Sequence, residues 1–217
     1  MGVAILIRHG HSTANADGIL SGRAPGVHLS ERGQREAREL AVAFANVPVD
    51  HVHVSPLERT RQTATLIFGD RVLHDEYGII ECDYGDWSGR PLADLAKEPL
   101  WTNVQNEPES VVFPNGESLT AMALRAVDTV HRLSADKGVH AFVSHGDIIK
   151  AVVSDASGAP FSKFQRIVID PCSISVIMVG DEPRLLAANV PIAGAAAVLA
   201  GLVAAERGTV GGGGGAP

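Results

Sequence analysis

The sequence predicts an α/β fold, a three-layer α/β/α sandwich with a mainly parallel central sheet. Short apolar runs, such as residues 3–7 and 139–143, alternate with longer segments whose apolar residues recur at helical spacing. Strands that alternate with helices usually pair in parallel and carry helices on both faces of their sheet. The chain has 217 residues, 45% of them hydrophobic, which is enough to bury one sizeable core.

The expected elements follow one another along the chain with recognisable start signals. Residues 3–7 are a short apolar run, which we expect to be a buried strand near the centre of the sheet. Ser30 is a typical N-cap for the first long helix. Ser55 and Pro56 combine an N-cap serine with a proline at the first helical position, which predicts the start of the next helix. In chain order, we expect strands at 3–7, 49–54, 72–73 and 139–143, a hairpin at 174–179 and 185–190, and helices at 30–45, 56–68, 117–133 and from about 148.

Two regions depart from this alternation. Residues 77–116 hold both tryptophans, both tyrosines and several prolines, which indicates a compact cap insertion over the end of the sheet. We therefore expect one domain at residues 1–190, with the cap at about 77–116. Residues 191–217 are an Ala/Gly-rich C-terminal tail, for which we expect a surface helix followed by a flexible end at 211–215.

Composition argues against several classes of function. The formal net charge is −7 at pH 7, whereas a nucleic-acid-binding protein needs a broad basic face. Cys82 and Cys172 form no CxxC pair, so we expect neither a disulfide framework nor a zinc site. The first residues predict a strand rather than a signal peptide, and the alanine-rich tail is too weakly apolar to span a bilayer. We therefore expect a cytoplasmic protein with no nucleic-acid partner, no membrane partner and no cofactor.

Three polar clusters follow three of the predicted strands, at residues 8–10, 55–59 and 144–146. Ligands of such sheets bind at the carboxyl ends of the strands, so we expect the clusters to converge there. Arg8 and Arg59 carry guanidinium groups that match phosphate oxygens in bidentate fashion. A lone histidine after a strand is usually structural, but here His9 and His145 accompany both arginines. The joint pattern predicts a phosphoryl site that needs no metal.

The same clusters resemble the histidine phosphatase superfamily, also called phosphoglycerate mutase-like. Residues 7–15, IRHGHSTAN, resemble the RHGxSxxN signature of this family, and residues 55–64, SPLERTRQTA, resemble its SPLxRxxQTA segment. Six such segments occur in the family's order over about residues 3–190, and this makes the resemblance specific. The other four segments are 29–37, 81–89, 114–118 and 144–146, which resemble L[ST]xxGxxQA, ExxYGxWxG, PxGES and SHG.

The resemblance implies a role for each matching residue. His9 would be the nucleophile that becomes phosphohistidine, and Glu81 would protonate the leaving oxygen and later activate water. Arg8, Arg59 and His145 would hold the phosphoryl oxygens. Around these catalytic residues, the residues expected to bind substrate or phosphate are Asn15, Gly10, Gly146, His11, Ser12, Ser21 and Gly22.

The surroundings of these residues allow further expectations. An acid needs a raised pKa, and apolar neighbours such as Tyr84 and Trp87 would raise that of Glu81. Tyr84 and the two tryptophans also suggest a partly apolar cap that suits a phosphate on a bulky or aromatic group. His11 stands where relatives often carry Gln or Glu, so we expect it to line the pocket. Gly10 is expected to supply a backbone N–H donor to the anion.

Some nearby polar residues have a simpler structural explanation. Asp147 follows the second His-Gly pair, and we expect it to cap the next helix. His51 and His53 share one face of a strand, a spacing that suits a metal. No third ligand is apparent, so the pattern favours an ordinary surface strand with no metal site.

The predicted function is a metal-independent phosphomonoesterase that acts on a small phosphorylated metabolite through a phosphohistidine intermediate. A phosphoglycerate mutase-like phosphomutase is the alternative, because mutases use the same residues; the compact cap favours hydrolysis, since the glycolytic mutases carry longer insertions. A non-catalytic phosphoryl-binding protein is a second alternative, which the presence of both His9 and Glu81 disfavours. The sequence leaves open whether the chain is a homodimer.

Overall fold

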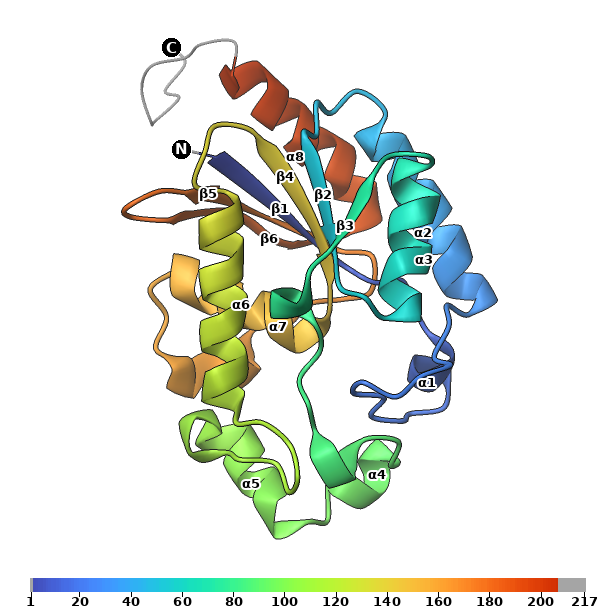
Figure 1. Ribbon diagram of the computed structural model, residues 1–217, viewed down its shortest axis with the longest axis vertical. Helices are drawn as coiled ribbons and strands as arrows, with labels where there is room; N and C mark the ends of the chain where they lie inside the picture. The colour runs from blue at the N-terminus through green and yellow to red at the C-terminus, as the bar shows by residue number, and fades with distance from the viewer. Residues whose placement is uncertain (1, 207–217) are drawn as a thin grey trace.

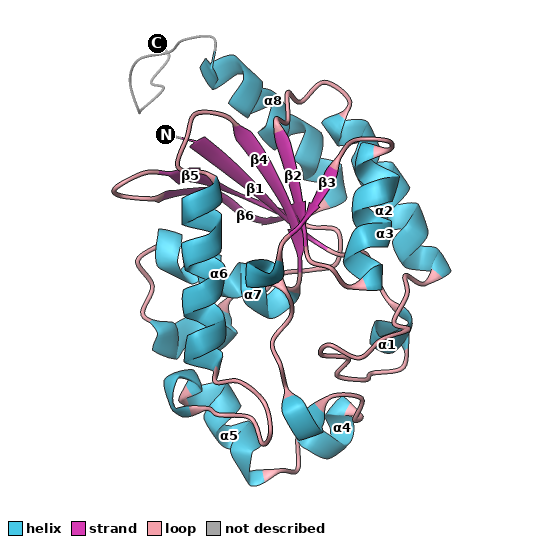
Figure 2. Cartoon of the chain, in the orientation of Figure 1, coloured by secondary structure: helices cyan, strands magenta, loops and turns pink. Residues whose placement is uncertain are grey.

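The structure is a computed structural model that describes residues 2–206 (Figure 1). A six-stranded sheet lies between two layers of helices (Figure 2), which confirms the predicted three-layer α/β fold. The strand order is β3-β2-β4-β1-β5-β6. The pairs β1–β5 and β5–β6 are antiparallel, and the other neighbouring pairs are parallel. The strands are β1 (Gly2–Arg8), β2 (His51–Val54), β3 (Leu73–Asp75), β4 (Val139–Ser144), β5 (Ile174–Val179) and β6 (Arg184–Val190).

The helices divide between the two faces of the sheet. Helices α6 and α7 cover one face, and α2, α3 and α8 cover the other (Figure 1). The α-helices are α1 (Thr13–Ala16), α2 (Glu31–Phe44), α3 (Glu58–Phe68), α4 (Leu92–Leu95), α5 (Pro99–Asn106), α6 (Leu119–Leu133), α7 (Gly146–Ala156) and α8 (Ile192–Glu206). The 3-10 helices are η1 (Tyr77–Ile79), η2 (Gly85–Trp87), η3 (Pro108–Ser110) and η4 (Phe161–Arg166).

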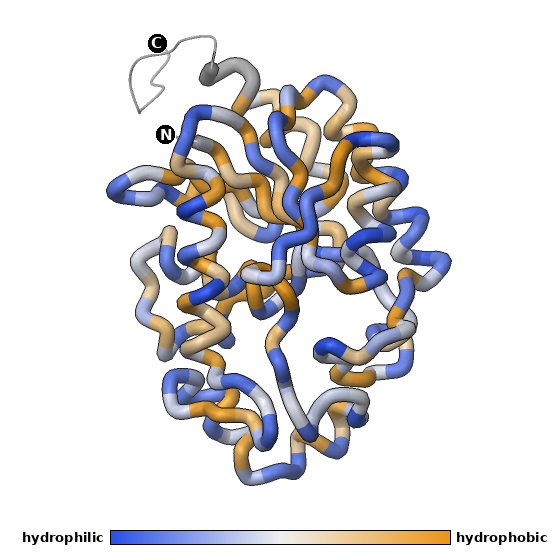
Figure 3. Tube along the Cα trace, in the orientation of Figure 1, coloured by the Kyte–Doolittle hydropathy of each residue, from blue (hydrophilic) through white to orange (hydrophobic). Residues whose placement is uncertain are grey.

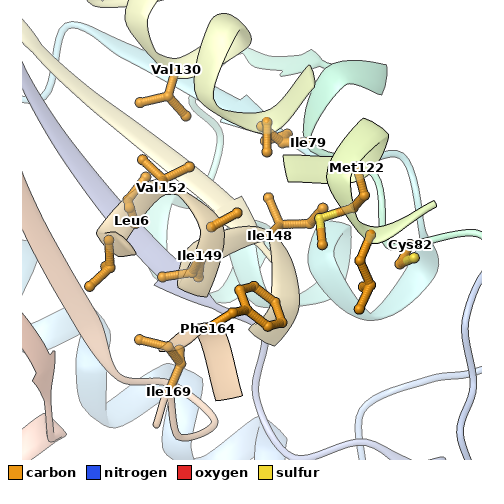
Figure 4. Packing of buried hydrophobic residues seen from close by; sticks show 14 of the residues in the cluster. Leu6, Ile79, Cys82, Met122, Val130, Ile148, Ile149, Val152, Phe164 and Ile169 are labelled. Atoms are coloured by element: carbon orange, nitrogen blue, oxygen red, sulfur yellow. The ribbon is translucent and has the colours of Figure 1, made fainter. Parts of the chain in front are cut away.

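Each face of the sheet carries its own hydrophobic core. Along β1, Leu6 belongs to the core under α6 and α7, while Ile5 and Ile7 belong to the core under α2, α3 and α8. The hydropathy of the trace alternates along the outer helices, as expected where only one face of a helix is buried (Figure 3). Figure 4 shows how Ile148 and Phe164 pack together in the first core.

The observed N-cap residues can be compared with the helix starts predicted from the sequence. Ser30 caps α2 as predicted, and its Oγ accepts a hydrogen bond from the Gly33 N–H at 3.2 Å. The predicted cap at Ser55 is wrong, because α3 begins at Glu58 with Leu57 at the N-cap position. The predicted cap at Asp147 is also wrong, because α7 begins one residue earlier. Both side chains make tertiary contacts instead, which are described below.

The segment expected to form the cap consists of short helices and turns, α4 and α5 among them, at the end of the molecule remote from the start of β1 and the end of α8 (Figure 1). Its tryptophans build the interior of this segment. Trp87 is 3% exposed, stacks on Trp101 at 6.1 Å between ring centroids and meets Phe113 edge-on. These rings therefore stabilise the segment and do not form an aromatic wall for a ligand.

The alanine-rich tail forms a helix up to Glu206, as predicted. Ala195 and Leu199 of α8 are fully buried against the core that α2 also covers. This stretch is therefore packed on the domain, while the glycines at 211–215 lie outside the described residues. No helix in the described part of the chain is long and apolar enough to cross a membrane.

His51 and His53 lie on the same face of β2, as expected, but His53 is not a surface residue. It is 7% exposed and stacks on Phe142 at 4.7 Å and on His140 at 5.6 Å between ring centroids. Both neighbours come from β4, which pairs with β2 in parallel register. Within residues 2–206, no three His, Cys, Asp or Glu side chains are placed to hold a metal ion together.

Candidate active site

The three polar clusters converge at the carboxyl ends of β1, β4 and β2, which are adjacent in the sheet. Backbone hydrogen bonds fix this convergence: the His9 N–H donates to the Ser144 carbonyl at 3.0 Å, and the Ser55 N–H donates to the Val143 carbonyl at 3.0 Å. The rings of His9 and His145 lie edge to face with centroids 5.3 Å apart. The topology thus brings together residues that are far apart in the sequence.

His9 is held in the tautomer that a nucleophile needs. It is 3% exposed, and its Nδ1 lies 2.8 Å from the carbonyl oxygen of Gly10. A carbonyl can only accept, so Nδ1 carries the proton and Nε2 keeps its lone pair. Burial, followed by the nearby charges of Arg59 and Arg8, holds the pKa of His9 well below its ordinary value. The ring is therefore neutral at neutral pH.

His145 is fully buried between an arginine and a serine. Its Nδ1 lies 3.2 Å from Arg59 Nη2, and its Nε2 lies 2.7 Å from Ser55 Oγ. The guanidinium can only donate, so Nδ1 accepts here and the Nε2–H donates to Ser55. Burial is the main cause that lowers the pKa of His145 well below its ordinary value. Since a hydroxyl both donates and accepts, Ser55 can hold either tautomer of this ring.

The two arginines present donors that the protein itself does not use. Arg59 is fully buried, and its Nη2 donates to the Gly22 carbonyl at 2.8 Å. Its Nε and Nη1, together with Arg8 Nε, meet no acceptor among the described residues. Unpaired buried guanidinium donors are costly unless an anion accepts from them. Because guanidinium donors match the geometry of phosphate oxygens, the unpaired donors beside His9 are candidates for binding an anion.

Glu81 faces the histidines from the other side. Its side chain is buried, with Oε1 accepting from the Cys82 N–H at 2.9 Å and Oε2 lying 3.7 Å from His145 Nδ1. Burial first, and then the negative charge of Asp147, raise the pKa of Glu81 to about 7. This agrees with the raised pKa expected of an acid, although the second cause is a carboxylate rather than an aromatic ring.

A cavity of about 200 Å³ lies beside the residues that the sequence predicts to be catalytic. Arg8, His9 and Glu81 lie in its wall, and Arg59 and His145 are buried behind them. Gly146 contributes the first turn of α7, whose N-terminal N–H groups favour an anion. The wall further includes Asn15, Ser21 and Gly22, which the resemblance expects to bind substrate, together with Ile19, Leu20, Tyr84, Leu92, Asp147, Lys150 and Ile169.

Three other residues expected to bind substrate, Gly10, Ser12 and His11, make hydrogen bonds within the protein and do not line the cavity. The Gly10 N–H donates to Thr63 Oγ1 at 3.1 Å, so it is not available to an anion. Gly10 is needed for space, because a Cβ there would lie 2.7 Å from the Gly33 carbonyl oxygen. Ser12 is the N-cap of α1 and bonds to Asn15. His11 bonds to Ser30 Oγ at 2.9 Å and does not line the cavity.

Two residues of the site, Ser55 and Asp147, were predicted from the sequence to be helix caps. Ser55 supports His145, but its Ser-Pro context has the pattern of a helix cap. Asp147 turns into the cavity wall, where it accepts from the Tyr84 hydroxyl at 2.8 Å and from Lys150 Nζ at 3.1 Å. Helix α7 begins at Gly146, so its first-turn side chains point toward the cavity. The only signal in the sequence was their position directly after the second His-Gly pair.

The sequence of the chain is similar to a known family and to several of its characterised members. The family model of the histidine phosphatase superfamily (branch 1) matches residues 4–190. The adenosylcobalamin/alpha-ribazole phosphatase of Escherichia coli is 31% identical over 183 residues, which covers 82% of this chain and 90% of that protein. Phosphoserine phosphatase 1 of Hydrogenobacter thermophilus is 34% identical over 192 residues, which covers 84% of this chain and 89% of that protein.

Solved structures show the same likeness. The alpha-ribazole phosphatase of Shigella flexneri superposes with a TM-score of 0.75 at 30% identity, covering 86% of this chain and 96% of that one. Phosphoglycerate mutases also occur among the relatives, at 28% identity for the 2,3-bisphosphoglycerate-dependent enzyme of Thermoplasma acidophilum. The chain therefore is an enzyme of the histidine phosphatase superfamily.

Proposed function

We propose that the chain hydrolyses small phosphate monoesters through a phosphohistidine on His9, without a metal. The observation that carries this proposal is the neutral His9 ring, with its free Nε2 next to the unpaired guanidinium donors of Arg8 and Arg59. Relatives whose names describe phosphatases of alpha-ribazole phosphate and of phosphoserine support a small phosphorylated substrate. A cavity of about 200 Å³ suits a substrate of that size.

In the first step, His9 Nε2 attacks phosphorus and the bond from phosphorus to the ester oxygen breaks. Arg8 and Arg59 hold the equatorial oxygens and stabilise their charge as the transition state forms. The protonated carboxyl of Glu81 gives its proton to the leaving oxygen, which departs as an alcohol. His145 keeps its tautomer in this step: Nδ1 accepts from Arg59 and the Nε2–H donates to Ser55, so the ring holds the Arg59 guanidinium in place for the phosphoryl oxygens.

In the second step, water attacks the phosphorus of phosphohistidine and the bond between nitrogen and phosphorus breaks. Glu81, now ionised, takes the proton of that water and is ready for the next cycle. Inorganic phosphate leaves, and His9 returns to its neutral state. One acid and one nucleophile thus serve both halves of the reaction.

The test compares the wild-type enzyme with His9→Ala on p-nitrophenyl phosphate, with a chelator present throughout. We expect turnover by the wild type and none by the variant, because no other side chain at the site can form the covalent intermediate. Loss of wild-type activity on adding chelator would contradict the metal-free mechanism. If neither protein turns over the ester, 3-phosphoglycerate with a bisphosphate primer separates a phosphomutase from a non-catalytic binding protein.

A further inference from the structure

The segment that carries Glu81 has no regular secondary structure of its own. Glu81 lies between η1 and η2, where the backbone belongs to neither a helix nor the sheet. Its position therefore depends on what the surrounding side chains do for the segment. One anchor comes from β4, where Ser144 Oγ donates to the Ile79 carbonyl at 2.7 Å.

Arg125 on α6 donates hydrogen bonds to three backbone carbonyls of this segment. Its Nη1 donates to the carbonyls of Gly78 and Ile80 at 2.9 and 2.7 Å, and its Nη2 donates to the carbonyl of Glu81 at 3.1 Å. Arg23, from the loop that also carries Ser21, donates from Nε to the same Glu81 carbonyl at 2.8 Å. The main chain of the acid is thus held by guanidinium groups from two sides.

Glu117 fixes both guanidinium groups at once. Its Oε1 accepts from Arg23 Nη2 at 2.8 Å and from Arg125 Nη2 at 2.6 Å, and its Oε2 accepts from Arg125 Nε at 3.1 Å. The same Oε1 also accepts from the Asp83 N–H at 2.8 Å, just beyond the acid. Burial alone would raise the pKa of Glu117, but the hydrogen bonds from Arg125 and Asp83 outweigh it and hold the pKa below its ordinary value.

These three residues do not touch the space where a substrate would bind. Arg23, Glu117 and Arg125 are absent from the cavity wall, and their side chains are 33%, 19% and 23% exposed. The backbone at Glu81, by contrast, is their shared target. Arg23 also follows Gly22, whose carbonyl accepts from Arg59, so the same group joins the acid to the loop beside the phosphoryl donors.

We infer that Arg23, Glu117 and Arg125, which we name the Glu117 brace, are positioning residues that hold Glu81 in place to protonate the leaving oxygen. This inference rests on the proposed role of Glu81. A displacement of about 1 Å at a reacting group can lower a rate by about a hundredfold, so the effect of losing the brace is measurable. Because the brace acts through the acid, it matters most for substrates that need the proton.

The experiment measures kcat/KM on two esters, p-nitrophenyl phosphate with a good leaving group and β-glycerophosphate with a poor one. For Arg125→Met we expect a loss of about tenfold to a hundredfold on β-glycerophosphate and less than about threefold on p-nitrophenyl phosphate. Arg125→Lys, which keeps the charge and part of the hydrogen bonding, should recover part of the loss. Arg132→Met, at an exposed site on the same helix, is the matched control and should leave both values unchanged.

The decisive comparison is a double-mutant cycle with the acid itself. If the brace acts through Glu81, Arg125→Met together with Glu81→Gln should be no slower on β-glycerophosphate than Glu81→Gln alone. Multiplicative losses, or equal losses of Arg125→Met on both esters, would overturn the inference. If Arg125→Met does not fold, Glu117→Gln enters the same cycle in its place. A Glu81→Gln enzyme that is equally impaired on both esters would instead contradict the proposed function of Glu81.

Discussion

Burial is the largest cause of the pKa shifts of His9 and Glu81. The pKa of His9 is lowered well below its ordinary value, while that of Glu81 is raised to about 7. His9 is therefore neutral at neutral pH, where Glu81 is still partly protonated. Two ionisable groups whose environments shift their pKa values in opposite directions are typical of an acid and a nucleophile that act together.

This pair predicts a specific dependence of activity on pH. Glu81 must be protonated to act as an acid, so kcat/KM on an alkyl phosphate should be highest below its pKa and fall as the pH rises through about 7. Glu81→Gln should lose this alkaline limb along with most of its activity on that ester. On p-nitrophenyl phosphate, which needs the proton less, the limb should be weak even in the wild type. If the fall of kcat/KM at alkaline pH persists in Glu81→Gln, the ionisation that causes it belongs to another group.

Ser55 carries a second prediction for a single residue. Ser55→Ala removes the 2.7 Å partner of His145 Nε2 and leaves a buried ring nitrogen unsatisfied. An unsatisfied buried group costs about 1–3 kcal/mol, which corresponds to a loss of roughly tenfold in kcat/KM if it falls on the transition state. Ser134→Ala is the matched control, because Ser134 is fully buried, has no partner for its hydroxyl among the described residues and lies away from the cavity. Equal activity in the two variants would show that Ser55 does not support catalysis.

At the scale of helices and strands, local patterns were enough to predict the fold. The apolar runs and helical periodicities gave the order of the elements, and Ser30 caps α2 as its position indicates. Local patterns could not predict the contacts between segments that are distant in the sequence. Ser55 and His145 are 90 positions apart, and the sequence around Ser55 is the same for a helix cap as for a tertiary partner. The N–H of Gly10 goes to Thr63, which a pattern local to the first strand could not reveal.

Helix α2 also constrains the loop that follows His9. Gly33 lies so close to this loop that a Cβ there would be 2.0 Å from the His11 carbonyl oxygen. That contact is far inside van der Waals distance and involves backbone, so one of the two segments must move. Helix and loop are therefore fitted to each other at this glycine.

Gly33→Ala should accordingly shift the loop of His9 and lower both stability and activity, despite the better helix propensity of alanine. Gly201→Ala is the matched control, since Gly201 also lies in a helix and a Cβ there would meet nothing within 4 Å. We expect the control to stabilise the protein by up to about 1 kcal/mol with unchanged kcat/KM. Thermal unfolding and the p-nitrophenyl phosphate assay measure both effects. A Gly33→Ala enzyme with wild-type stability and activity would show that the loop adapts.

At the scale of the whole molecule, the strands that end at the candidate site also carry a second group of histidines. His53 and His140 are buried on the face opposite the core of α2 and α3, with His51 and His74 nearby on β2 and β3. All four come from strands whose carboxyl ends lie at or next to the site. We expect the titration of this group to make the stability of the fold depend on pH.

The final prediction concerns that dependence. Burial first, and then the charges of His140, His74 and His51 and of Arg132 on α6, lower the pKa of His53 to about 4 in the folded state. Since the unfolded chain binds this proton near its ordinary value of about 6.5, the folded state loses stability as the pH falls from about 6.5 towards 4 and gains none above that range. With screening by water at the rim of the group, the loss attributable to His53 is on the order of 2 kcal/mol.

His53→Phe keeps a ring against Phe142 but cannot titrate, so its free energy of unfolding should fall less between pH 7 and pH 4.5 than that of the wild type. His28→Phe, at an exposed site outside this group, should follow the wild type. Urea unfolding at the two pH values measures the difference, and identical losses in His53→Phe and the wild type would assign the pH dependence to other buried groups, His9 and His145 among them.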